Sequence, residues 1–173
     1  MNLIETLLSS GNGAVAQQLG SQFGLDTTKV TSLLGAVAPL LAHGLKEKLS
    51  SDPTGGGLLG QLQSGGLASY VDDPASLSSP QAAQQGQSIL GSLFGGSTGG
   101  PLNAIVSTVA EKTGISAGVI QTVLPVLTSL VMGFLAKQTA GDPGKLTHVL
   151  DSVSGEHAGL LSSLKAAAGK IFG

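Results

Sequence analysis

The sequence contains no cysteine, and this absence removes several kinds of chemistry at once. Disulfide bonds, thiolate nucleophiles and every zinc or iron–sulfur site built on cysteine ligands are excluded. The redox compartment stays open, because a chain without cysteine is stable in reducing and in oxidising surroundings. With 173 residues, the chain is long enough to bury a core without covalent cross-links.

Charged and aromatic side chains are also scarce. Charged residues make up 10% of the chain, where roughly a quarter is usual, and aromatic residues make up 3%. The net charge of -2 argues against a nucleic-acid partner, since contacts to phosphates require a basic surface. The surface must consist largely of small and polar uncharged residues, and such weak charge repulsion permits copies of the chain to associate.

The first residues, MNLIETLLSSGNG, do not have the pattern of a secretion signal. Glu5 stands where such a signal carries lysine or arginine, and polar residues interrupt the apolar run after a few positions. A cytoplasmic protein is therefore the default expectation. Export, or a cell-surface location reached by another route, stays open.

The chain carries an internal repeat. Residues 14–53 align without a gap with residues 104–143, at an offset of 90, and an Asp-Pro pair ends both copies. Gly24 matches Gly114 in this alignment. Apolar residues match apolar residues in seven further pairs: Val15 with Ile105, Leu19 with Val109, Leu25 with Ile115, Val30 with Ile120, Leu33 with Val123, Val37 with Leu127, and Leu41 with Val131.

The spacing within each copy is helical. Apolar residues recur at intervals of three and four between Val30 and Leu45, whereas strand-like alternation is nearly absent. Gly24 and Gly114 are each expected to end one helix shortly before the next begins. The predicted fold class is all-α, with two tandem pseudo-symmetric helical repeats packed into one bundle and a C-terminal helix.

Composition and repeat boundaries divide the chain into four parts. Residues 1–63 form the first helical repeat, and residues 64–88 form a linker rich in Ser, Gly, Gln and Pro, with a helix expected from Pro80. Residues 89–155 form the second repeat, and residues 156–173 a C-terminal helix. Because a few short helices bury little apolar surface by themselves, we expect the repeats to pack on each other.

One stretch of the second repeat, from Gly114 to Ala136, contains no charged residue and is long enough to span a bilayer. The matching stretch of the first repeat carries several charges, among them Asp26, Lys29 and Lys46. Homologous halves should share one environment, so the pattern favours a helix buried in the protein core. Membrane association stays as the alternative.

No motif for catalysis or cofactor binding emerges. A GxGxxG spacing from Gly55 lacks the preceding strand that a dinucleotide site requires. The three histidines, His43, His148 and His157, are far apart in a chain without cysteine, and this argues against a zinc site. We therefore predict no catalytic residue, no cofactor and no metal.

Two segments, GLDTTKVTSLLGAVAPLL from Gly24 and GISAGVIQTVLPVLTSLV from Gly114, carry a family resemblance together with the FGG and GDP sequences at Phe94 and Gly141. Over about residues 1–155, this pattern resembles the YidB-like family of uncharacterised bacterial proteins. The resemblance implies an all-helical bacterial domain without an established enzymatic activity. It implies no functional residues, because none are defined for the family.

These observations predict a non-enzymatic structural or scaffold protein that associates with itself into homo-oligomers or filaments through neutral helix surfaces. The alternative is an adaptor at the bacterial envelope or membrane surface that uses its apolar helices conditionally. The residues predicted to take part in self-association are Val126, Met132, Phe134, Leu160, Leu161, Leu164, Ile171 and Phe172.

Overall fold

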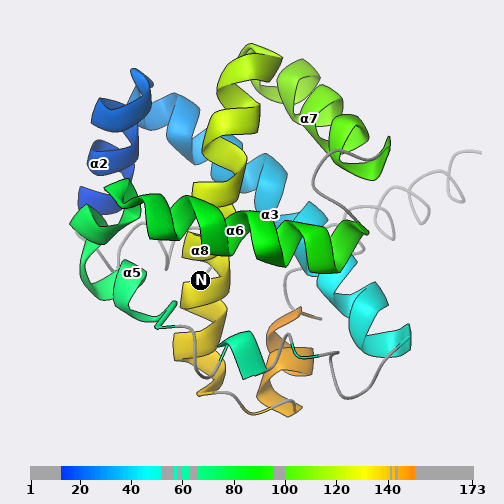
Figure 1. Ribbon diagram of the computed structural model, residues 1–173. Helices are drawn as coiled ribbons and strands as arrows, with labels where there is room; N and C mark the ends of the chain where they lie inside the picture. The colour runs from blue at the N-terminus through cyan, green and yellow to red at the C-terminus, as the bar shows by residue number, and fades with distance from the viewer. Residues whose placement is uncertain are drawn as a thin grey trace, which may run out of the picture.

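The computed structural model of the chain is a bundle of helices (Figure 1). It describes residues 13–51, 57, 60–62, 66–95, 100–140, 142 and 144–150. These residues contain helices and no strand, so the all-α prediction is confirmed. In chain order the elements are α2 (Ala14–Phe23), α3 (Thr27–Ser51), α5 (Ser69–Asp72), the 3-10 helix η2 (Pro74–Ser78), α6 (Pro80–Phe94), α7 (Gly100–Thr113), α8 (Ala117–Thr139) and a helical stretch over residues 144–150.

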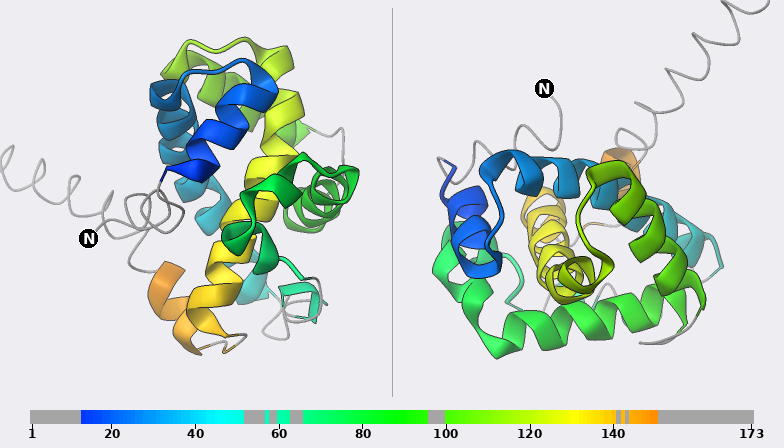
Figure 2. Two further views of the ribbon diagram at one scale, coloured as in Figure 1. Left: turned by 90° about the vertical axis from the view of Figure 1, so that its left-hand side faces the viewer. Right: turned by 90° about the horizontal axis from the view of Figure 1, so that it is seen from above.

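The centre of the fold is α8. It makes its most extensive contact with α6, and α3, α5 and α7 also pack against it. Viewed from above, α8 lies inside a ring of other helices (Figure 2, right). Every residue from Val123 to Ala136 is buried. A helix covered all round has no polar face, which explains why this stretch carries no charge.

The prediction that the uncharged stretch is buried in the chain's own core is therefore confirmed for its part from Val123 to Ala136. Within the described residues, α8 is the one helix long and apolar enough to span a membrane, and 78% of its most apolar window lies inside the protein. A core helix passes the same test of length and composition. Length and hydropathy therefore do not distinguish the two environments.

Two helix pairs, α2 with α3 and α7 with α8, are connected by similar turns. Gly24 and Gly114 follow the first helix of each pair with φ angles of 66° and 69°, and the next helix begins at Thr27 and at Ala117. This left-handed conformation is favourable for glycine, whereas a Cβ atom makes it costly. The predicted helix ends at both glycines are confirmed.

The apolar positions that the internal repeat matches lie in the core. Among the seven matched pairs, Leu25 is the one residue that is partly exposed. The two halves nevertheless make different contacts. The repeat matches α2 with α7, but α7 packs against α3 of the other pair as well as against α8, whereas α2 packs mainly against its own partner α3 and against η2. The starts of α3 and α8 keep the offset of 90 residues, whereas α2 begins at Ala14 and α7 at Gly100, and the surroundings of the two pairs differ.

The segment predicted to be a linker, residues 64–88, belongs to the packed body where the structure describes it. It contains α5 and η2, and α6 begins at Pro80, where a helix is predicted. The division of the chain into two repeats joined by this segment stays a prediction. Although the segment is mostly polar, four of its apolar side chains are buried in the core: Leu67, Tyr70, Val71 and Leu77. The predicted C-terminal helix, residues 156–173, lies outside the described residues.

Candidate functional site

The site is built on α6, and local sequence fixes where this helix begins and ends. The hydroxyl of Ser79 caps its start by accepting a hydrogen bond from the Ala82 backbone N–H at 3.4 Å. Pro80 occupies the first turn, where its missing N–H costs nothing. Gly95 ends the helix with a φ angle of 78°. The result is a helix that lies across α8 at the front of the molecule (Figure 1).

The backbones of α6 and α8 come very close at Gly86. A Cβ atom built on Gly86 would lie 1.8 Å from the carbonyl oxygen of Pro125 in α8. One helical turn further on, the buried Ser129 hydroxyl of α8 donates a hydrogen bond to the Ala82 carbonyl oxygen of α6 at 2.5 Å. Since no side chain separates the helices here, their relative position is tightly set.

A second close approach holds the segment before α5 against α8. A Cβ atom on Gly133 would lie 2.1 Å from the carbonyl oxygen of Leu67. The Tyr70 hydroxyl of α5 donates a hydrogen bond to the Gln85 side chain of α6 at 3.0 Å. Both α6 and the segment before α5 therefore contact one row of α8 residues spaced four apart: Pro125, Ser129 and Gly133.

Where α6, α7 and the first part of α8 meet, they leave a cleft of about 340 Å³. Its apolar floor and walls are buried, whereas three exposed carboxamides, one from each helix, stand around it. The apolar lining residues are Leu90 of α6, Leu102 and Val106 of α7, and Leu124 and Pro125 of α8. The carboxamides belong to Gln87, Asn103 and Gln121.

The chemistry of the cleft is neutral, because none of its eight lining residues is charged. Carboxamides donate and accept hydrogen bonds, but they do not serve as acids or bases near neutral pH. Pro125 adds a backbone acceptor, since it has no N–H to donate to the carbonyl oxygen of Gln121 one turn earlier. An apolar hollow with a few converging polar groups is the usual form of a binding site.

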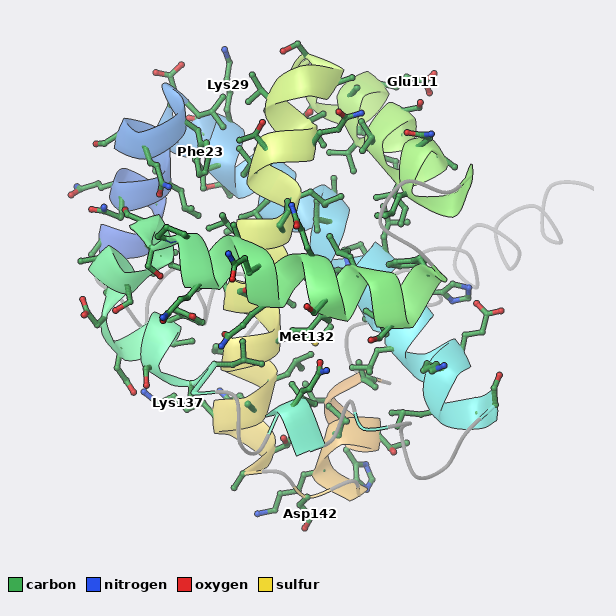
Figure 3. The ribbon with its side chains drawn as sticks, in the orientation of Figure 1. Phe23, Lys29, Glu111, Met132, Lys137 and Asp142 are labelled. Atoms are coloured by element: carbon green, nitrogen blue, oxygen red, sulfur yellow. The ribbon has the colours of Figure 1, made fainter. Side chains whose placement is uncertain are left out.

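Three of the residues predicted for self-association lie deep in the protein. Val126, Met132 and Phe134 are 3%, 0% and 2% exposed, so they lie in the chain's own core. Met132 lies at the middle of α8 (Figure 3). A role for them in self-association stays a prediction. The other five predicted residues lie outside the described residues: Leu160, Leu161, Leu164, Ile171 and Phe172.

Charged side chains lie at the edges of the molecule. Figure 3 shows Lys29 and Glu111 at one end and Lys137 and Asp142 at the other. Lys137 forms an ion pair with Asp72 in which both side chains are exposed. In the part of the chain that the structure describes, no three His, Asp or Glu residues gather as a metal site. His43 and His148 are exposed, and His157 is outside that part.

Sequence reasoning did not find the cleft. Gln121 is a polar residue within the uncharged stretch from Gly114 to Ala136, but this signal points to no partner. The carboxamides come from three helices that are separated along the chain, and only the crossing of α6 and α8 brings them together. No local pattern encodes that crossing.

Comparison with known proteins gives a family and no individual relative. No curated protein and no solved structure matches the chain. The family model described as bacterial protein of unknown function (DUF937) matches residues 5–138, which is most of the chain. This match agrees with the resemblance to YidB-like proteins, and we conclude that the chain belongs to this bacterial family.

Proposed function

We propose that the protein is a non-enzymatic structural protein that associates with copies of itself into oligomers or filaments. We also propose that its two helix pairs are pseudo-symmetric repeats, as their shared turns and buried positions suggest. The observation that carries the first proposal is a continuous surface without charge. No charged residue occurs in α2 or between Asp73 and Glu111.

This surface, here called the neutral face, consists of the exposed residues of α2, η2, α6 and α7 as far as Ala110. These elements adjoin one another, since α2 and α6 both contact η2, and α6 contacts α7. The exposed side chains are Ser, Gln, Asn, Ala and Pro. Uncharged polar groups lose less hydration free energy than ions when two copies meet, and no charge repulsion opposes the contact.

The side chains that line the cleft support the non-enzymatic part of the proposal. General acid–base catalysis uses His, Asp, Glu, Lys, Tyr or Cys side chains, and the cleft offers carboxamides and hydrocarbon instead. The carboxamide and apolar side chains of the cleft suit the binding of a ligand better than its chemical conversion. A cytoplasmic location remains part of the proposal as its default.

Sedimentation velocity at several protein concentrations tests self-association. We expect the full chain to sediment as species larger than a monomer, with a size that grows with concentration. The double variant Gln84→Lys with Ser88→Lys places two charges on the exposed side of α6, and we expect it to raise the dissociation constant about tenfold or more.

The matched control places the same charges elsewhere. Ser32→Lys with Ser50→Lys changes two exposed serines of α3, outside the neutral face, and should leave association unchanged. A full chain that sediments as a monomer at every concentration would overturn the proposal. If both double variants weakened association equally, added charge would act at any position on the surface, and the neutral face would not be the contact surface.

A second candidate function, conditional association with a membrane, is favoured by one observation on α8. The hydroxyls of Thr128 and Thr139 donate hydrogen bonds to carbonyl oxygens of α8 itself, each at 2.8 Å. Such groups keep their partners if the helix enters a bilayer. The Ser129 hydroxyl, by contrast, donates its hydrogen bond to the Ala82 carbonyl oxygen of α6.

Flotation with vesicles of mixed anionic and zwitterionic phospholipids tests this candidate. Because α8 is covered in the folded chain, association requires the helices around it to open, so we expect little binding to the native protein. A partly destabilised variant such as Leu127→Ala should float in larger amount if α8 enters lipid. Recovery of both proteins wholly in the soluble fraction would exclude this function.

A further inference from the structure

We infer that the cleft between α6, α7 and α8 is the docking site for an apolar segment of a second copy of the chain, residues 160–172. This inference rests on the proposed self-association and names the contact that produces it. Three observations support this assignment. They are the side chains that line the cleft, the sequence of the segment, and the length of chain between residue 150 and the segment.

The lining decides which chemical class can occupy the cleft. No cationic side chain is present to bind a phosphate or carboxylate, and no acidic side chain is present to bind a cation. No aromatic ring lines it either, so a base or a sugar ring would have no stacking partner. A peptide with apolar side chains and uncharged polar groups fits the floor and the carboxamides.

The segment LLSSL, residues 160–164, has this composition. Leu160, Leu161 and Leu164 are spaced so that a helix would carry them on one side, while two serines provide hydroxyls next to them. The leucines suit the apolar floor, and hydroxyls pair well with the carboxamides of Gln87, Asn103 and Gln121. Residues 160–164 and the cleft are both free of charge, and the two lysines of the segment, Lys165 and Lys170, follow this part. Docking of residues 160–164 therefore requires no ion to lose its water.

The position of residues 144–150 indicates a second copy as the donor. Thr147 and Leu150 adjoin the C-terminal end of α3, beside Lys46 and Leu49. The cleft lies towards the N-terminal end of α8, at Gln121 and Leu124. Along the axis of α8 this is about 20 Å from the C-terminal end of the helix, which residues 144–150 follow.

Residues 151–159 reach at most about 30 Å when fully extended. Within one chain about two thirds of that reach is needed to come level with the cleft, and the rest has to lead around the helices that border it. A neighbouring copy meets no such limit. Because each copy then offers one segment and one cleft, the contact is head-to-tail and can continue into a filament.

Disulfide trapping tests the contact directly, because the chain has no cysteine of its own. One full-length protein carries Asn103→Cys at the cleft, and a second, larger by a fused tag, carries Ser163→Cys. After mild oxidation of the mixture, we expect a cross-linked mixed dimer. Ser32→Cys on α3 replaces Asn103→Cys in the control mixture, and its yield of mixed dimer should be several-fold lower.

Further variants separate the outcomes. Adding Leu161→Ser and Leu164→Ser to the Ser163→Cys chain, or Gln121→Lys to the Asn103→Cys chain, should lower the yield several-fold. Deleting residues 159–173 should abolish the larger species in sedimentation. An equal yield in the control mixture would overturn the inference, as would a closed monomer from both cysteines in one chain without any mixed dimer.

The inference and the proposed function can fail separately. Larger species that persist after deletion of residues 159–173, with no trapping at Asn103, would refute the docking site and leave self-association intact. A full chain that is monomeric at every concentration would refute both.

Discussion

Replacing Gly86 with alanine is expected to lower the free energy of unfolding by about 3 kcal/mol. The new methyl group would lie 1.8 Å from the Pro125 carbonyl oxygen, a backbone atom that cannot turn aside. The helices α6 and α8 must therefore move apart, which breaks the Ser129 hydrogen bond to Ala82 and loosens the core around it. Urea unfolding followed by circular dichroism measures the change.

The same substitution at Gly91 is a matched control within α6. No heavy atom lies within 4 Å of a Cβ atom built there, and the backbone is helical. Gly91→Ala should raise the free energy of unfolding by about 0.5–1 kcal/mol, because alanine has fewer unfolded conformations to lose. Similar effects of the two substitutions would show that α6 and α8 do not meet at Gly86.

Replacing Phe134 with alanine is expected to lower the free energy of unfolding by about 3–5 kcal/mol. Phe134 is 2% exposed, and it is the largest of the fully buried side chains in the described part of the chain. Its removal leaves a cavity at the centre of the molecule, where the surrounding helices are held by close backbone contacts and cannot collapse to fill it. Urea unfolding at a low protein concentration, where copies stay apart, measures this loss.

The partly buried Phe23 of α2 provides the comparison. Phe23→Ala removes the same side chain from the edge of the core, so its cost should be clearly smaller than that of Phe134→Ala. The effect of Phe134→Ala should not depend on protein concentration. If it appeared only at concentrations where copies associate, Phe134 would act between molecules and the core position would be contradicted.

The helix pairs could be predicted from the sequence because their signals are local. Apolar spacing between Val30 and Leu45 follows the helical period, and Gly24 and Gly114 supply the left-handed residue that ends a helix. The burial of α8 could also be predicted, since its uncharged stretch has a charged counterpart in the first repeat. These conclusions required no knowledge of which helices touch.

The contacts of the segment between the helix pairs could not be predicted, because they depend on residues far away in the sequence. Gly86 in a Gln-rich segment resembles a loop glycine until Pro125 is placed against it. Leu67 and Leu77 are likewise isolated apolar residues among serines and glycines, and their burial requires α8 and its neighbours as partners. The cleft follows from the same contacts, so it was missed for the same reason.

The order of the elements along the chain has a consequence for synthesis of the protein. The helices that cover α8, namely α3, α5, α6 and α7, all precede it and therefore leave the ribosome first. The most apolar helix thus emerges when these four helices have already been made. The time during which its hydrocarbon surface is open to water, chaperones or other nascent chains is correspondingly short.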